Sequence, residues 1–168
     1  WTWGAKMEVG RLSDPLAGDI RRRALGFSAA YKEGGLKYSG NMELRREDTE
    51  STLANSSVPS VGSVNPSGHR NTWLVRNTLA YQLTKEWRLL GKLNWSDSNN
   101  TNGAFYDGGY HEVVAAAAYR PVDNDRWNTL FKYTNFYNLP TAGQVTAAGS
   151  TADYAQKSQV FAVDTIYD

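Results

Sequence analysis

Apolar and polar residues alternate along eight stretches of the chain, and a period of two residues predicts β-strands. Residues 36–45 alternate most cleanly: every even position is Leu, Tyr, Gly or Met, and every odd position is Lys, Ser, Asn, Glu or Arg. Each such strand has one apolar and one polar face. The pattern predicts strands near residues 1–9, 24–31, 36–45, 73–83, 87–95, 112–120, 127–134 and 160–167.

The connections between these strands alternate in length. Short polar turns are expected at residues 32–35, 84–86 and 121–126. Segments rich in Ser, Thr, Asn and Gly separate the other strands, and they predict long loops near residues 47–71, 96–109 and 138–155. A shorter turn-rich stretch covers residues 13–19. This order predicts an all-β fold in which antiparallel strands run up and down in sequence.

Aromatic residues are concentrated beside the short turns. Tyr81 and Trp87 flank one turn and Tyr119 and Trp127 flank another, all on the apolar face. Trp and Tyr gather where a membrane meets water, whereas the core of a β-sandwich would spread its rings along the strands. We therefore expect a transmembrane β-barrel with an aromatic girdle on the short-turn side, made of Trp1, Trp3, Tyr31, Tyr38, Tyr81, Trp87, Tyr119, Trp127 and Tyr167.

The opposite faces of the predicted strands carry charges of both signs. In a barrel these faces line the lumen, where charges pair or stay hydrated, and in a soluble sheet they would simply face water. The sequence pattern contains no helix that could cover the apolar faces, which favours the barrel. The residues expected to face the lumen are Lys6, Glu8, Lys37, Glu43, Arg45, Arg76, Arg88, Lys92, Glu112, Arg120, Lys132 and Asp164.

Composition is compatible with strands that cross a membrane and not with helices that do. The chain has 168 residues, of which 40% are hydrophobic, and its mean hydropathy is negative. No stretch approaches the roughly 18 consecutive apolar residues of a spanning helix, whereas spanning strands present only every second residue to lipid. The aromatic content of 12% suits a membrane interface, and a sugar-binding or otherwise β-rich soluble protein is the alternative.

Charge excludes a nucleic-acid-binding surface. The formal net charge is +1 and the basic residues are interleaved with acidic ones. The one basic cluster, Arg21-Arg22-Arg23, is expected at a solvated rim or against lipid headgroups. The chain has no cysteine, which fits passage through an oxidising compartment without disulfides. Trp1 opens directly on a strand pattern, so we expect the signal peptide of an exported protein to be removed or to lie upstream.

Catalytic chemistry is sparse in the sequence. His69 falls in a predicted loop and His111 at a strand rim beside Glu112, where solvated or structural roles are expected. No Gly-x-Ser-x-Gly motif, metal-spaced His/Cys set or phosphate-binding glycine loop is present. The sequence therefore predicts no enzyme, no cofactor and no metal site.

The chain resembles bacterial outer-membrane β-barrel proteins over nearly all of its length. The phrases Ala117-Ala-Tyr-Arg-Pro-Val-Asp-Asn-Asp-Arg-Trp127 and Gln156-Lys-Ser-Gln-Val-Phe-Ala-Val-Asp-Thr-Ile-Tyr167 look like hairpins in the carboxy-terminal barrels of large surface-anchored proteins of Gram-negative bacteria. This resemblance implies an integral outer-membrane protein that the barrel assembly machinery inserts. It also implies that the short turns face the periplasm and the long loops face outside.

The chain departs from that family at its last residues. Such barrels usually finish on an aromatic residue, whereas this chain ends Tyr167-Asp168. Tyr167-Asp168 and Trp1-Thr-Trp3 look like two of the short turns cut open. We therefore expect about eight strands that form a portion of a larger barrel, with further strands or surface domains of the same protein as partners.

Three functions follow as hypotheses. The first is an outer-membrane barrel that serves as a pore or as the membrane anchor of a larger surface protein, with the lipid bilayer as its surroundings. The second is a barrel enzyme with a site on its external rim, against which the poor set of catalytic residues counts. The third is a soluble lipocalin-like barrel with its apolar face inward, which solubility without detergent would reveal.

Overall fold

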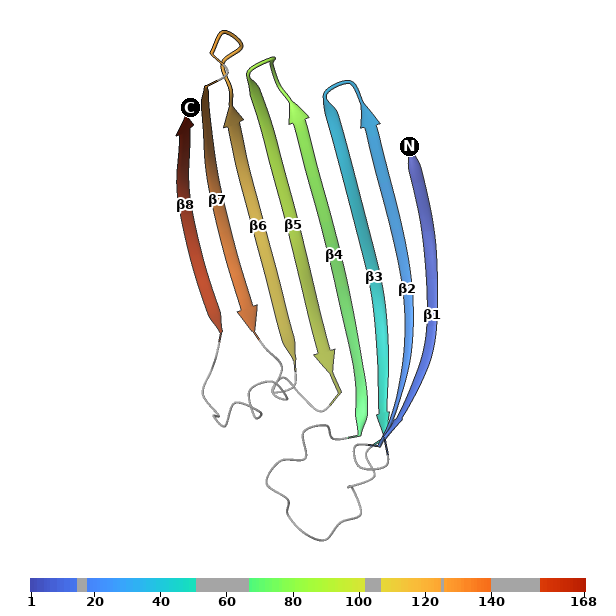
Figure 1. Cartoon of the computed structure of the whole chain (residues 1–168). Coiled ribbons are helices and arrows are strands. Elements are labelled where there is room, and N and C mark those ends of the chain that lie inside the picture. The colour runs from blue at the N-terminus through green and yellow to red at the C-terminus, as the bar shows by residue number, and fades with distance from the viewer. Residues whose placement is uncertain (15–17, 51–66, 102–106, 125, 140–154) are drawn as a thin grey trace.

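The protein is described by a computed structural model, in which residues 1–14, 18–50, 67–101, 107–124, 126–139 and 155–168 are described below. Eight long β-strands form one sheet, and no helix in these ranges is long and apolar enough to cross a membrane. Figure 1 shows the strands side by side in one layer. They are β1 (Thr2–Asp14), β2 (Gly18–Glu33), β3 (Leu36–Glu50), β4 (Gly68–Gln82), β5 (Trp87–Asn100), β6 (Gly108–Tyr119), β7 (Trp127–Leu139) and β8 (Gln156–Tyr167).

The strands follow one another across the sheet in chain order. Each strand pairs antiparallel with the next, from β1 to β8. The predicted all-β, antiparallel, up-and-down arrangement is therefore confirmed. The sheet does not close into a barrel in the described part of the chain. There β1 pairs only with β2 and β8 only with β7, so the sheet is open at both edges. These edges lie on opposite sides of the sheet in Figure 1.

The strands are longer than the alternation predicted. β3 continues to Glu50 and β4 begins at Gly68, so both enter the segment expected to be a loop near residues 47–71. The reason is that polar residues keep pairing there: Arg22 Nη2 lies 2.7 Å from Glu47 Oε1 across β2 and β3. β5 and β6 likewise extend into the loop predicted near residues 96–109, and β7 extends into the loop predicted near residues 138–155. Residues 51–66, 102–106 and 140–154 of the predicted loops lie outside the described residues.

The first short turn contains only Gly34 and Gly35. Glu33 and Leu36 pair across it, and Gly34 has a φ of +53°, a left-handed conformation that costs other residues energy. At Gly35 the reason for glycine is the close approach of β4: a Cβ atom there would lie 2.9 Å from the Gln82 carbonyl oxygen. Thr84 organises the second short turn, where its Oγ1 accepts hydrogen bonds from the amides of Glu86 and Trp87 at 3.2 and 3.1 Å.

The sheet has no hydrophobic core among the described residues. Ala24, at 7% exposure, is their one buried hydrophobic side chain, whereas Trp3 is 74% exposed and Met7 77% exposed. The accessible surface of the chain is 11,652 Å², against about 8,300 Å² for a folded monomer of this mass. A single layer of sheet therefore leaves its apolar face without a covering element in the described structure.

Substituting Gly34 by Ala tests the turn geometry. We expect Gly34→Ala to lower the free energy of unfolding by about 1 kcal/mol, because Ala carries a Cβ atom into the left-handed region. Gly10→Ala is the matched control, since a Cβ atom at either position meets no atom within 4 Å and Gly10 has no positive φ. Equilibrium denaturant unfolding measures both. Equal effects of the two substitutions would contradict the assigned turn.

Candidate functional site

The register of the sheet brings the apolar sides of all eight strands onto one face. Met7 lies opposite Leu25, Leu25 opposite Leu44, and Leu44 opposite Trp73. The same continuity extends through β8, where Phe161 lies opposite Tyr133. We call this side the apolar face and the other side the polar face. The alternation predicted strand by strand therefore adds up to one continuous apolar surface.

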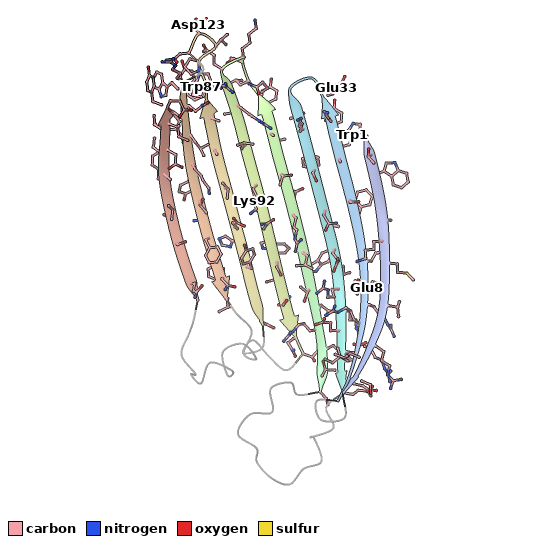
Figure 2. All side chains as sticks on the ribbon, viewed as in Figure 1. Trp1, Glu8, Glu33, Trp87, Lys92 and Asp123 are labelled. Carbon is pink, nitrogen blue, oxygen red and sulfur yellow. The ribbon has the colours of Figure 1, made fainter. Side chains whose placement is uncertain are left out.

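The aromatic residues predicted as a girdle all belong to the apolar face near the short turns. Figure 2 shows Trp1 and Trp87 toward the same end of the sheet as Glu33, the residue before the first short turn, and Asp123, in the third. Ring centroids lie 4.5 Å apart for Trp1 and Tyr31, 4.7 Å for Trp87 and Tyr119, and 5.9 Å for Tyr119 and Trp127. Tyr31 faces Tyr38, and Trp127 faces Tyr167. Their contact with a membrane stays a prediction.

The line of rings crosses the sheet obliquely. Residues opposite one another on neighbouring strands form a register row, and successive rows on one face are two residues apart. Tyr31 and Tyr38 share one row, and Tyr81 on β4 lies one row nearer the short turns. Trp87 and Tyr119 share the next row, and Trp127 and Tyr167 share the row after that. A level line crosses rows in this way when the strands are tilted to it, as they are in closed barrels.

A second border runs parallel to the first at the opposite ends of the strands. Along β3, β4, β5, β6 and β8 the last large apolar residue of the face moves one row at each of three steps, in the order Leu44 and Trp73, Trp95, Val113, then Phe161. On β7 the polar Asn135 follows Tyr133, and Tyr137 and Leu139 lie beyond it on the same face. Asp97, Asn135 and Gln159 follow directly on the same face. Between the two borders lies an apolar band of nearly constant height, and β7 alone among the described strands β3–β8 carries further apolar residues beyond it. The role of Trp73 and Trp95 was missed from the sequence, although a polar residue of the same face adjoins each, Asn71 beside Trp73 and Asp97 beside Trp95.

Polar side chains inside the apolar band are hydrogen-bonded to one another. Tyr38 donates its hydroxyl to Asn77 Oδ1 at 2.6 Å, and the hydroxyls of Thr129 and Thr165 lie 3.2 Å apart. Tyr38 also covers Gly40, where any Cβ atom would collide with the tyrosine hydroxyl and with Asn77. Asn77, the polar exception in the predicted apolar pattern of residues 73–83, is therefore a satisfied member of this face.

The charged residues predicted to face a lumen lie on the polar face, with Arg120 directly after β6. Three ion pairs form among them: Lys6 with Glu8 at 3.0 Å, Arg45 with Glu43 at 2.8 Å, and Lys92 with Glu112 at 2.9 Å. Within the described chain, five others are exposed without an ion pair or side-chain hydrogen bond: Lys37, Arg76, Arg88, Lys132 and Asp164.

Glu112 is the most heavily bonded carboxylate of the polar face. It accepts hydrogen bonds from Lys92 Nζ at 3.0 Å, Asn94 Nδ2 at 2.9 Å and the Tyr110 hydroxyl at 3.1 Å. The donors come from β5 and β6. Charged hydrogen bonds of this kind fix side chains more strongly than neutral ones. The cluster therefore ties two neighbouring strands together on the polar side.

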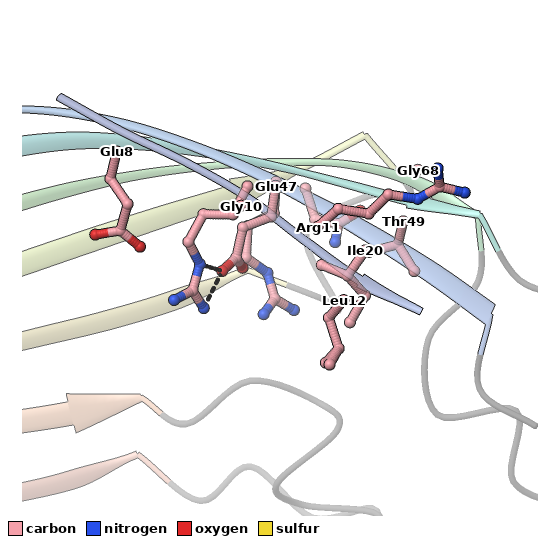
Figure 3. Close-up of a pocket in the computed structure, with 11 residues that line it drawn as sticks. Glu8, Gly10, Arg11, Leu12, Ile20, Glu47, Thr49 and Gly68 are labelled. Carbon is pink, nitrogen blue, oxygen red and sulfur yellow. Dashed lines mark hydrogen bonds and ion pairs between the residues drawn. The ribbon is translucent and has the colours of Figure 1, made fainter. Parts of the chain in front are cut away.

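A cavity of about 380 Å³ opens on the polar face at the end of the sheet opposite the short turns. Glu8, Arg22, Glu47 and Arg70 line it, and none but Glu8 was singled out from the sequence as lumen-facing. Figure 3 shows Glu8, Glu47 and Leu12 projecting from one side of the arched strands into the space that the sheet curves around. The polar face is therefore the concave one here. Arg70 Nε is buried there with no hydrogen-bond partner among the described residues.

The two histidines have structural partners. His69 lies in β4, not in a loop as predicted, and its Nδ1 is 2.5 Å from Asp48 Oδ1. A hydrogen bond from Arg46, with a smaller one from His69, lowers the pKa of the Asp48 carboxyl, which lies beyond the apolar band. His111 Nε2 is 3.1 Å from Asn135 Oδ1. In the described ranges no three His, Cys, Asp or Glu residues gather as a metal site.

Comparisons with known proteins give no further guide to the chain. No family model matches it, and no match was found among curated proteins or among solved structures. The resemblance to outer-membrane barrels therefore stays a prediction, and the function is inferred below from the geometry of the two faces.

Replacing Glu112 tests the cluster on the polar face. We expect Glu112→Gln to lower the free energy of unfolding by about 1–3 kcal/mol, because three donors lose a charged acceptor. Asp164→Asn is the control: Asp164 lies on the same face, exposed and without a partner in the described chain, and its replacement should change stability by less than about 0.5 kcal/mol. Urea unfolding followed by tryptophan fluorescence compares them. Equal losses would contradict the assigned network.

Proposed function

We propose that the sheet is part of the wall of a transmembrane β-barrel in a bacterial outer membrane, with its apolar face against lipid and its polar face toward the lumen. The observation that carries this proposal is the apolar band with parallel borders. A soluble protein has no reason to hold the limits of its exposed apolar residues at nearly one height from strand to strand, whereas a bilayer imposes two such limits.

The dimensions of the band suit a bilayer. Trp73 to Tyr81 on β4 and Trp87 to Trp95 on β5 each span nine residues, close to the 9–11 residues of a spanning strand. Eight steps of about 3.3 Å give about 27 Å, and a strand tilt of about 40° reduces the height to about 20 Å. The outward apolar band of bacterial barrels is about 25 Å tall. The border rings extend the band toward that value.

Hydrogen bonding inside the band supports the same environment. Lipid offers no partner to a polar group, so each one must be satisfied within the protein. The Tyr38–Asn77 and Thr129–Thr165 pairs meet this requirement. In water neither pair would be needed, because the solvent could satisfy these side chains.

A sheet with two open edges needs further strands if it crosses a membrane. Unpaired backbone groups cannot face the hydrocarbon of a bilayer, so β1 and β8 must each have a neighbour in the membrane. We propose that further strands of the same protein lie between β1 and β8 and complete the barrel, and that the barrel assembly machinery inserts it. The curvature of the sheet, with the polar residues on its concave side, weighs against a lipocalin-like barrel with an apolar interior.

We propose two roles for such a barrel. It serves as a pore, or it anchors a larger surface protein in the membrane. Conductance across a planar bilayer separates them: steady channels would favour the pore, and insertion without conductance would favour a plugged anchor. Solubility and monomeric behaviour without detergent would contradict both.

A pair of neighbouring alanines tests which face meets lipid. Ala115 lies on the apolar face opposite Gly91 and Tyr133, and Ala116 lies on the polar face opposite Leu90 and Lys132. In phospholipid vesicles we expect Ala115→Arg to lower the free energy of unfolding by about 2–4 kcal/mol, the cost of an arginine near the bilayer midplane. Ala116→Arg should cost less than about 1 kcal/mol.

The measurement is urea unfolding of each variant from vesicles, followed by tryptophan fluorescence. Ala115 is exposed in the described structure, so an arginine there would be harmless if water covered this face. Similar stabilities of the two arginine variants would therefore refute the assignment of the apolar face to lipid. The identical starting residue and charge make Ala116→Arg a direct control.

A further inference from the structure

Four arginines stand on the apolar face just beyond the apolar band, at the end opposite the short turns. Arg11 lies opposite Arg21 across β1 and β2, and Arg23 lies opposite Arg46 across β2 and β3. The row of Arg23 and Arg46 directly follows the row that contains Leu25 and Leu44. Arg11 also lines the cavity of the polar face, whereas Arg21, Arg23 and Arg46 emerge on the proposed lipid side at the height where hydrocarbon gives way to headgroups.

The side chains of Arg21, Arg22 and Arg23 alternate between the two faces of the sheet. Arg22 lines the cavity on the polar face and pairs with Glu47 at 2.7 Å. Arg21 and Arg23 point to the opposite side of the sheet, since neighbours in a strand alternate. The basic cluster seen in the sequence is thus not one patch, and its outward part joins Arg46 from β3.

The four arginines differ in whether a carboxylate pairs with their charge. Arg11 is paired with Asp19, Arg21 lies 3.4 Å from Glu50, and Arg46 Nε lies 3.1 Å from Asp48. Arg23 is exposed and makes no ion pair or hydrogen bond within the described chain. Its direct neighbour across the strands is another arginine, and like charges in that position destabilise a sheet. An anion bound between Arg23 and Arg46 would remove this repulsion.

We propose that Arg23 and Arg46 bind the phosphate of an anionic lipid headgroup in the leaflet at this end of the barrel. Guanidinium groups hold phosphate oxygens in bidentate geometry, and basic residues beside a membrane attract anionic lipids. This inference rests on the proposed function, because only a membrane at the apolar band brings headgroups to this row. The lipid chains would then lie along Val9, Leu25 and Leu44.

Lipid titration tests the site in the full chain folded in neutral detergent micelles. Dioctanoyl phosphatidylglycerol, dioctanoyl phosphatidylcholine and inorganic phosphate are titrated separately, and binding is measured by isothermal titration calorimetry. We expect phosphatidylglycerol to bind about thirtyfold more tightly than phosphatidylcholine, since each arginine near the surface contributes a factor of about five. The R23Q/R46Q double variant should abolish this preference, and Arg23→Lys should retain most of it.

The double variant R76Q/R88Q is the matched control. It removes the same charge from exposed arginines of the polar face, and it should leave the preference unchanged. Loss of the preference in both double variants would overturn the site as a general charge effect. Binding of inorganic phosphate as tight as that of phosphatidylglycerol would overturn the lipid as its ligand. Strand content by circular dichroism confirms folding, and failure of the wild-type chain to enter micelles or vesicles would refute the proposed function itself.

Discussion

A single layer of β-sheet cannot bury its own apolar face, and the rest of this structure depends on that constraint. Every strand alternates, so half of its side chains are committed to one side. With Ala24 as the one buried hydrophobic residue of the described chain, the stability of the sheet cannot come from an internal core. It must come from strand pairing, from contacts along each face, and from whatever surroundings accept the apolar face. Hydrocarbon accepts it without a second protein layer.

The two faces solve different physical problems. On the apolar face, the Tyr38–Asn77 hydrogen bond satisfies polar atoms without water, and ring contacts such as Trp87 with Tyr119 pack neighbouring strands together. On the polar face, carboxylates such as Glu112 collect donors from neighbouring strands, and unpaired cations such as Arg76 remain hydrated. Both sets of contacts join neighbouring strands. They therefore stabilise the same register from opposite sides.

The sequence predicted the strands and their faces because the period of two is a local property. Even at Ala115 and Ala116, where the two faces differ least in chemistry, the period of two between Glu112 and Tyr119 agrees with the register of the sheet. Strand ends were not predictable: Glu47 and Asp48 look like loop residues until Arg22 and His69 are seen to pair with them across the sheet. The second border was missed for the same reason. Trp73 and Trp95 gain their meaning only from the rows in which the register places them.

The oblique course of the aromatic line has a consequence for assembly. A strand that pairs one residue out of register turns its apolar side toward the lumen, and alternation alone excludes that error. A slip of two residues keeps every side chain on its correct face, so alternation cannot detect it. In the proposed membrane, such a slip would move the Tyr and Trp rings of a hairpin by about 5 Å along the membrane normal, into hydrocarbon or out into water. The line of rings would thus distinguish the correct pairing from the one error that the pattern of faces accepts.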